Sequence, residues 1–189
     1  MIIEGNSNHT KELRINLTGL QLIWDFVHEW QGPKLSIVVV GGGNLLADMV
    51  KIPGASRVVQ GIYQPYDDDA ILDFLDCMGG GYPQSKKAVS KERAKDLFSS
   101  IFWSTRNGIC ITITAATISS RYRKGLDQAW YMITGMEEPE LIALEKVHEE
   151  TYNKLTPEEI YSYRAMQDYQ ITTTVLNKLK ELHGGTKST

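Results

Sequence analysis

The stretch LSIVVVGGGN, residues 35–44, decides the fold of this chain. Its first six residues are an unbroken, largely β-branched run, the kind of strand that a parallel sheet buries on both faces. Gly41-Gly42-Gly43 follows, and the apolar residues of 44–51 then recur at helical spacing, with Asn44 as a candidate N-cap. Strand, glycine turn and helix in this order open a βαβ unit, in which ligands bind at the carboxyl end of the strand. We therefore expect an α/β fold with a binding site beside the three glycines.

Patterns elsewhere in the chain also indicate alternating helices and strands. Apolar residues spaced by three and four predict a first helix from about residue 17 to 30, with this apolar face: Leu17, Leu20, Ile23, Trp24 and Val27. Further strands are expected at 57–63, 108–114 and 128–134, and further helices at 69–77 and from Ser90 onward. Residues 140–147 are ambiguous between strand and helix, and we favour a strand that forms a hairpin with 128–134.

The strongest local signal marks the start of a final helix. Thr156-Pro157-Glu158-Glu159 combines an N-cap threonine, a proline at the first helical position and a glutamate three residues after the cap. The helix is expected to run to about His183 and to be followed by a polar tail, 184–189. Residues 79–83 are rich in glycine and are expected to form a loop. We expect one domain over residues 1–189, with its core in about 17–183.

Composition is that of an ordinary globular protein. Hydrophobic residues make up 42% of the chain and charged residues 23%, which argues against disorder. A net charge of −3 provides no broad positive field for a nucleic-acid backbone, so we expect no nucleic-acid partner. The first ten residues lack the pattern of a secretory signal, and no apolar run approaches the ~20 residues that span a bilayer. We therefore expect a cytoplasmic protein with no membrane partner.

Residues that commonly bind metals are scattered along the chain. Cys77 and Cys110 have neither CxxC spacing nor a paired framework, and the four histidines show no metal-binding spacing. The run Asp67-Asp68-Asp69 is more typical of a helix N-terminus than of a divalent-cation site. We expect neither a metal site nor a cofactor.

Several short motifs occur in the order in which one known family carries them. Along the chain they are Gly42-Gly43-Asn44-Leu45-Leu46-Ala47, Lys51-Ile52-Pro53-Gly54-Ala55-Ser56, Tyr66, Ala88-Val89-Ser90, Ile111-Thr112-Ile113-Thr114, and Ser162-Tyr163-Arg164 with Gln170 and Val175-Leu176. Together they extend over about residues 17–183 and resemble the C-terminal domain of the CinA competence/damage-inducible proteins. The resemblance implies a three-layer α/β sandwich, with a mixed, mostly parallel sheet that carries helices on both faces.

Members of that family hydrolyse the carboxamide of nicotinamide mononucleotide, and this chain departs from them where that chemistry takes place. Such hydrolysis needs an activated hydroxyl nucleophile, a base and donors for the oxyanion. Aligned without a gap, the family's glutamate and serine fall on Val38 and Val39, and its lysine falls on Ile71. The family's T-G-x-A-G-P loop is replaced by residues 114–119, with the sequence TAATIS. Since a valine cannot act as a nucleophile, the resemblance implies a catalytically degenerate site.

Other parts of the family's site are retained. The candidate ligand-binding residues are Gly41, Gly42, Gly43, Asn44, Tyr66, Thr114 and Arg164. Backbone N–H groups of the glycine turn could approach a phosphate, aided by the dipole of the following helix, and Arg164 could pair with the same phosphate. A tight turn without any ligand explains the glycines equally well. The basic segment 121–124 either brings cations to an anionic nucleotide or is a plain surface loop.

Two functions are compatible with this reading. The first is a degenerate CinA-like domain that binds a nucleotide or related phosphate ligand and serves in sensing, regulation or assembly. The second is an active amidohydrolase with a relocated hydroxyl, for which Thr114 is the candidate catalytic residue and Thr117 or Ser119 are alternatives; the valines favour the first. The resemblance also implies a homo-oligomer and, by analogy with related eukaryotic domains, a nucleotidylyltransferase-like domain as a partner.

Overall fold

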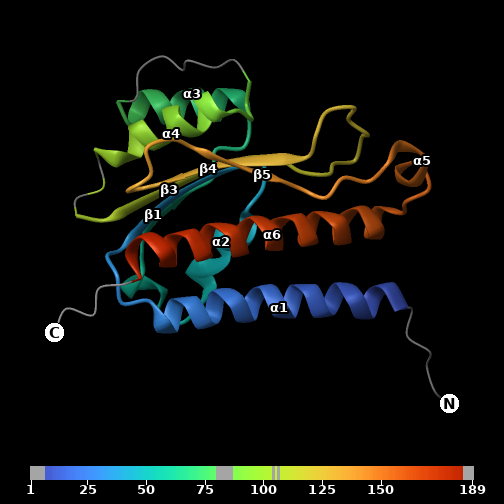
Figure 1. Ribbon diagram of the computed structural model, residues 1–189, viewed down its shortest axis with the longest axis horizontal. Helices are drawn as coiled ribbons and strands as arrows, with labels where there is room; N and C mark the ends of the chain where they lie inside the picture. The colour runs from blue at the N-terminus through green and yellow to red at the C-terminus, as the bar shows by residue number, and fades with distance from the viewer. Residues whose placement is uncertain (1–6, 80–86, 104, 106, 185–189) are drawn as a thin grey trace.

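A five-stranded sheet forms the centre of the computed structural model, which describes residues 7–79, 87–103, 105 and 107–184 (Figure 1). The strands are β1 Leu35–Val40, β2 Val59–Tyr63, β3 Ile109–Ala116, β4 Gln128–Ile133 and β5 Glu140–Ala143. The first four lie within about two residues of the strands that the sequence predicts, whereas β5 begins at the predicted residue 140 but ends at Ala143, four residues before the predicted end. The ambiguous segment after residue 140 is a strand, as favoured, and it pairs antiparallel with β4.

The order of the strands in the sheet is β2-β1-β3-β4-β5. β1 pairs in parallel with β2 and with β3, whereas β3–β4 and β4–β5 are antiparallel. The sheet is therefore mixed, as expected, but the expectation that it is mostly parallel is wrong, because parallel and antiparallel pairings are equal in number among the described strands. Val40 at the end of β1 is in register with Thr114 near the end of β3, so the loops that follow these two strands leave the same edge of the sheet. We call this the carboxyl edge.

Helices cover both faces of the sheet, as expected (Figure 1). The α-helices are α1 Ser7–Glu29, α2 Asn44–Ala47, α3 Asp68–Cys77, α4 Lys91–Phe102, α5 Glu149–Tyr152 and α6 Pro157–His183, and two 3-10 turns are η1 Asp48–Lys51 and η2 Ala55–Arg57. α3 and α4 lie on one face, and α2 and α6 lie on the other. α1 lies outside α6 and contacts α6, α2 and η1. This side of the sheet therefore carries a double helical layer.

Side chains cap the helices where the sequence indicates. Thr156 accepts a hydrogen bond from the N–H of Glu159, whose carboxylate accepts one from the N–H of Thr156, so the capping box is complete. Ser90 caps α4 by accepting from the N–H of Arg93, and Asp67 caps α3 by accepting from the N–H of Ala70. These caps fix where the helices begin because they satisfy N–H groups that lack a partner within the helix.

The core lies on both sides of β1, which is buried along its whole length. Val39 packs with residues of α1, α2 and α6, whereas Val38 and Val40 pack with α3 and α4. Ile71 belongs to the second of these clusters. Val38, Val39 and Ile71, on which the sequence alignment places the family's catalytic groups, are therefore apolar core residues of the sheet and of α3.

Two predicted helices differ from the observed ones. α1 begins at Ser7, and part of its predicted apolar face is in contact with solvent: Leu17 is 59% exposed and Trp24 is 43% exposed, whereas Ile23 and Val27 are buried. The reason is that α1 is an outer helix that packs inward on α6, α2 and η1, so that Leu17 and Trp24, in its predicted apolar arc, remain in contact with solvent. The helix expected at 44–51 is a four-residue α-helix followed by a 3-10 turn, and its N-cap is Gly43 in place of Asn44.

Several predictions concern segments that lie partly or wholly outside the described residues, or absences that can be stated only for the described ones. The glycine-rich loop lies outside them from residue 80 onward, as does the polar tail from residue 185. Within the described part of the chain, no helix has both the length and the apolar character needed to cross a membrane. The same residues include no cluster of three or more histidine, cysteine or acidic side chains suited to a metal ion. Cys77 is exposed and Cys110 is buried, and both are free thiols.

Candidate functional site

The glycine turn after β1 has a conformation and a crowding that require glycine. Gly41 and Gly43 have φ of +80° and +86°, in the left-handed region that side chains disfavour. A Cβ on Gly41 would lie 2.2 Å from the carbonyl oxygen of Ala115, and one on Gly42 would lie 2.7 Å from Cγ2 of Thr117. The turn is therefore held tightly against the end of β3 and the loop that follows it. Close packing alone explains why residues 41 and 42 are glycines, whether or not the turn binds a ligand.

One turn of α6 holds the glycine turn in place. Nη2 of Arg164 donates to the carbonyl oxygen of Gly41 at 3.0 Å. The carboxylate of Asp168 accepts from the N–H of Gly43 at 2.8 Å through Oδ1 and from Nδ2 of Asn44 at 3.3 Å through Oδ2. Burial raises the pKa of the Asp168 carboxyl, and the Gly43 N–H, the Arg164 charge and Asn44 oppose that shift. Among the groups that were expected to face a phosphate, the Gly43 N–H and the Asn44 amide therefore already have an acidic partner.

Gln167, which lies between Arg164 and Asp168 on α6, forms hydrogen bonds with two further segments. Its side chain is completely buried. Oε1 accepts from the N–H of Ile118 at 2.8 Å, and Nε2 donates to Oδ2 of Asp127 at 3.0 Å and to the carbonyl oxygen of Glu145 at 2.7 Å. The loop after β3 and the segment after β5 are thus joined to the same turn of α6 as the glycines.

A cavity of about 320 Å³ opens beside this turn of α6. Its lining comes from α1, α2, η1 and α6: Gly19, Leu20, Asn44, Leu45, Asp48, Tyr161, Arg164, Ala165, Asp168 and Tyr169. Pockets that bind small molecules combine mostly apolar walls with a few convergent polar groups, and start at about 300 Å³. Asn44 and Arg164 are the two predicted binding residues that line it. This cavity, which we call the α1–α6 cavity, is the candidate site.

Two other predicted residues lie away from the α1–α6 cavity. Thr114 is completely buried on the side of the sheet that α3 and α4 cover, and its Oγ1 donates to the carbonyl oxygen of Ala88 at 3.0 Å. Alternation along β3 explains this, because Thr112 faces the same side and donates to Ala94 of α4. Tyr66, beyond β2, is 80% exposed. The structure thus separates Thr114 and Tyr66 from the site that contains Asn44 and Arg164.

Of the two alternative hydroxyls, Thr117 lies nearer to the glycine turn. Its Oγ1 is 3.5 Å from the carbonyl oxygen of Gly41, and the residue is buried. Ser119 instead donates to the backbone carbonyl of Arg121. Thr117 is consequently the hydroxyl best placed to meet anything bound at the turn.

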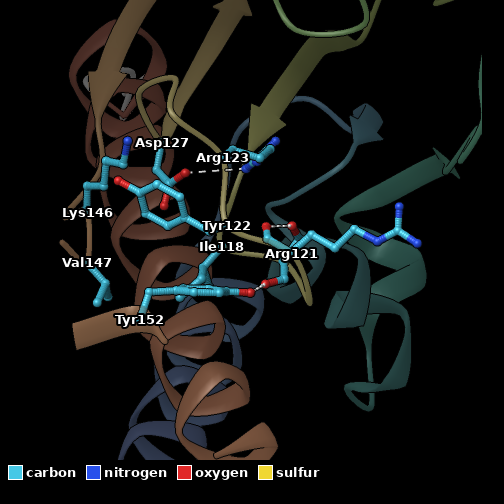
Figure 2. Close-up of a pocket in the computed structure, with 9 residues that line it drawn as sticks. Ile118, Arg121, Tyr122, Arg123, Asp127, Lys146, Val147 and Tyr152 are labelled. Carbon is cyan, nitrogen blue, oxygen red and sulfur yellow. Dashed lines mark hydrogen bonds and ion pairs between the residues drawn. The ribbon is translucent and has the colours of Figure 1, made fainter. Parts of the chain in front are cut away.

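The basic segment that follows β3 surrounds a second, much smaller hollow of about 10 Å³ (Figure 2). Arg123 donates to the carbonyl oxygen of Thr117 and pairs with Asp127 at 3.3 Å. Nζ of Lys146 donates to the backbone of residues 124 and 125 and lies 5.2 Å from the ring centre of Tyr122. The side chain of Arg121 extends away from the other lining residues in Figure 2. Arg123 and Lys146 therefore stabilise this loop, and the hollow has room for little more than a water molecule.

Asp168 and Gln167 were not singled out from the sequence, although a signal for them exists. Both lie on α6 one turn before Ile171, which is completely buried and starts the apolar face that continues through Val175. Polar residues in line with an apolar helical face are buried, and buried polar groups need partners. Their partners belong to loops more than 20 residues away in the chain, which the pattern of one helix does not reveal.

Comparisons with known proteins identify the fold. No family model matches the sequence, and no curated protein is significantly similar to it. Solved structures do match: a competence/damage-inducible protein of Agrobacterium tumefaciens has 20% identity and a TM-score of 0.54, over 86% of this chain and 94% of that one.

Two further structures have lower identity but a similar fold. A CinA superfamily protein of Enterobacter cloacae matches with 14% identity and a TM-score of 0.58, over 85% of this chain and 90% of that one. The competence damage-inducible protein A of Klebsiella pneumoniae matches with 13% identity and a TM-score of 0.58, over 87% and 96%. The sheet order, the helices on its two faces and these three matches agree, and this chain has the fold of the CinA competence/damage-inducible proteins.

Proposed function

We propose that this chain is a cytoplasmic binding domain of CinA fold that takes a nucleotide or a related ligand in the α1–α6 cavity and does not hydrolyse amides. A sensing, regulatory or assembly role follows from binding without turnover. The observation that carries the proposal is the combination of a ligand-sized cavity beside the glycine turn with a β1 strand whose end presents only buried valines.

The valines argue against hydrolysis on chemical grounds. Val38 and Val39 are at most 2% exposed and pack into opposite sides of the core. Ile71, in the place of the family's lysine, is also buried in an apolar cluster. Loss of members of a catalytic unit typically lowers the rate by several orders of magnitude, because the members act together.

The cavity supports binding because its lining is chemically mixed. Leu20 and Leu45 provide apolar surface, and Tyr161 and Tyr169 provide rings on which a base or a pyridine ring can lie. Arg164 and Asn44 bring polar groups to the same space. This is the pattern of apolar wall and few polar groups that orients small ligands.

An active amidohydrolase is the competing candidate, and the position of Thr117 is the observation in its favour. A Cβ on Gly42 would lie 2.7 Å from Cγ2 of Thr117 and 3.3 Å from Oδ1 of Asp168, so a hydroxyl residue and a carboxylate flank the same glycine. The proposal predicts that this pair does not turn over an amide.

Two measurements on the whole chain separate the candidates. The first is ammonia release from nicotinamide mononucleotide, and the second is a thermal-shift screen with nucleosides and nucleotides. A ligand at one hundred times its Kd stabilises by about 2.7 kcal/mol, which corresponds to a rise in Tm of roughly 5–10 °C for a domain of this size. We expect such a shift without ammonia release.

A matched pair of variants locates the binding site. Ala165→Leu fills the α1–α6 cavity from α6, whereas Ala70→Leu makes the same change at a half-buried position of α3, on the other side of the sheet. The thermal shift should disappear in the first variant and persist in the second. Ammonia release that is lost in Thr117→Ala or Thr114→Ala would refute the proposal and establish the amidohydrolase.

A further inference from the structure

The glycine turn is occupied by a carboxylate of the protein itself. Asp168 accepts one hydrogen bond from the turn's backbone at Gly43 and one from the side chain of Asn44. Its Oδ1 also lies 3.3 Å from the position that a Cβ of Gly42 would take, so the carboxylate sits directly over the turn. An anion held by the Gly43 N–H and the Asn44 amide would have the same contacts. Asp168 therefore fills the anion position that the glycines create.

A phosphate is disfavoured beside this carboxylate for two reasons. Two of the donors that would bind it, the Gly43 N–H and the Asn44 amide, are already engaged by Asp168. A second anion within a few ångströms of a partly buried carboxylate is also repelled more strongly than it would be in water. Arg164 does not relieve this repulsion fully, because its Nη2 donates to the carbonyl oxygen of Gly41 and its charge is already offset by Asp168, one helical turn away. Asp48 adds another carboxylate to the lining, although Lys51 pairs with it at 2.5 Å.

The remaining lining is suited to a ligand that brings hydrogen-bond donors. The carboxylates of Asp48 and Asp168 can only accept, so they favour amine, amide or hydroxyl hydrogens. Tyr161 and Tyr169 offer ring surface for a planar aromatic group. A cavity of about 320 Å³ accommodates a nucleoside-sized molecule.

We propose that Asp168 is the specificity-determining residue of the α1–α6 cavity: by occupying the anion position of the glycine turn, it selects an unphosphorylated nucleoside or similar donor-bearing aromatic ligand over the corresponding 5′-phosphate. This inference rests on the proposed binding function and makes its ligand class narrower. It assigns the glycine turn a structural role and assigns the choice of ligand to α6.

The test compares ligands that differ only in a phosphate. Isothermal titration measures the affinity of the whole chain for adenosine and adenosine monophosphate, and for nicotinamide riboside and nicotinamide mononucleotide. The wild type is expected to bind the nucleoside of at least one pair, at least tenfold more tightly than its monophosphate. In Asp168→Asn, which keeps the size of the side chain and removes its charge, this preference should fall at least tenfold.

A control and a second probe keep the outcomes distinct. Asp48→Asn removes a carboxylate from the same cavity but not from the turn, and should change the preference less than threefold. Wild-type binding of both monophosphates as tight as that of their nucleosides would overturn this inference and leave the binding function standing. If the wild type binds none of the four ligands, the proposed function fails. Titration with inorganic phosphate then tests the role of Asp168 at the glycine turn on its own. A gain of phosphate binding in Asp168→Asn supports it, and no gain in that variant or in Asp168→Ala overturns it.

Discussion

Replacement of Gln167 by methionine tests whether one buried side chain holds the carboxyl edge together. Gln167 makes hydrogen bonds of 2.8, 3.0 and 2.7 Å with Ile118, Asp127 and Glu145, and none of its surface is exposed. Methionine fills a similar volume and makes none of these bonds. The variant should fold, because the core around it keeps its apolar contacts, but the edge should be less stable.

The expected loss follows from these three bonds. Each contributes about 0.5–1.5 kcal/mol net, and the buried N–H of Ile118 and the carboxylate of Asp127 lose a partner as well. Burial of the apolar methionine side chain offsets part of this loss of stability. We expect the free energy of unfolding to fall by about 2–4 kcal/mol. In a domain of this size that lowers Tm by roughly 5–12 °C.

Urea unfolding followed by circular dichroism measures the change, and Gln170→Met is the matched control. Gln170 lies one turn further along α6 and makes one exposed hydrogen bond, to the carbonyl oxygen of Ala143 at 3.0 Å. Its replacement should cost less than about 1 kcal/mol. The reasoning is refuted if the two variants lose the same stability, because the network around Gln167 would then contribute nothing beyond a surface contact.

The remaining predictions concern the glycine turn, the start of α6 and the Asp168 carboxyl. Gly41→Ala should lower the free energy of unfolding by more than about 2 kcal/mol, because its φ is +80° and the new Cβ would lie 2.2 Å from the carbonyl oxygen of Ala115; urea unfolding measures the loss. Thr156→Ala removes the N-cap of α6 and should cost about 1 kcal/mol in the same assay. The folded protein raises the pKa of Asp168 above 3.8, so its neutral form is favoured on folding. The stability of the wild type relative to Asp168→Asn should therefore be greatest below about pH 4 and should decline as the pH rises through the folded-state pKa, which unfolding at a series of pH values tests.

Each of these predictions has its own control. Gly125→Ala adds a Cβ that meets no atom within 4 Å, and should change stability by less than about 0.5 kcal/mol. Ser162→Ala removes another hydroxyl from the first turns of α6, one that bonds only within the helix, and should cost less than Thr156→Ala. A stability difference between wild type and Asp168→Asn that rises with pH would contradict the direction of the pKa shift.

Local signals in the sequence predicted most of the secondary structure. The strand before the glycine turn, the caps Ser90 and Thr156 and the final helix are all present, because each depends on neighbouring residues only. The strand at residue 140 is correct as well. Which residues on the apolar face of α1 are buried and which are exposed could not be predicted, since this depends on how much of α1 the distant α6 covers.

The candidate site was predicted in part. The glycine turn, Asn44 and Arg164 come together as expected, whereas Thr114 lies across the sheet. The alternation of side chains along β3 predicted that Thr114 lies on one face of the strand. It could not predict which helices cover that face, because the connections between the strands determine this. Asp168 reaches Gly43 across 125 positions of the chain, so its role follows only from the tertiary structure.

α6 extends over 27 residues, about 40 Å, and its polar contacts lie at both ends of the sheet. At its far end Nε2 of His183 lies 2.6 Å from the carbonyl oxygen of Thr134. The N–H groups of Gly43 and Ile118 both point to α6 side chains, so exposing either one to solvent requires the helix to separate from the sheet. In hydrogen–deuterium exchange these two amides should consequently exchange with one shared opening free energy, as parts of a single cooperative unit, although they belong to different loops.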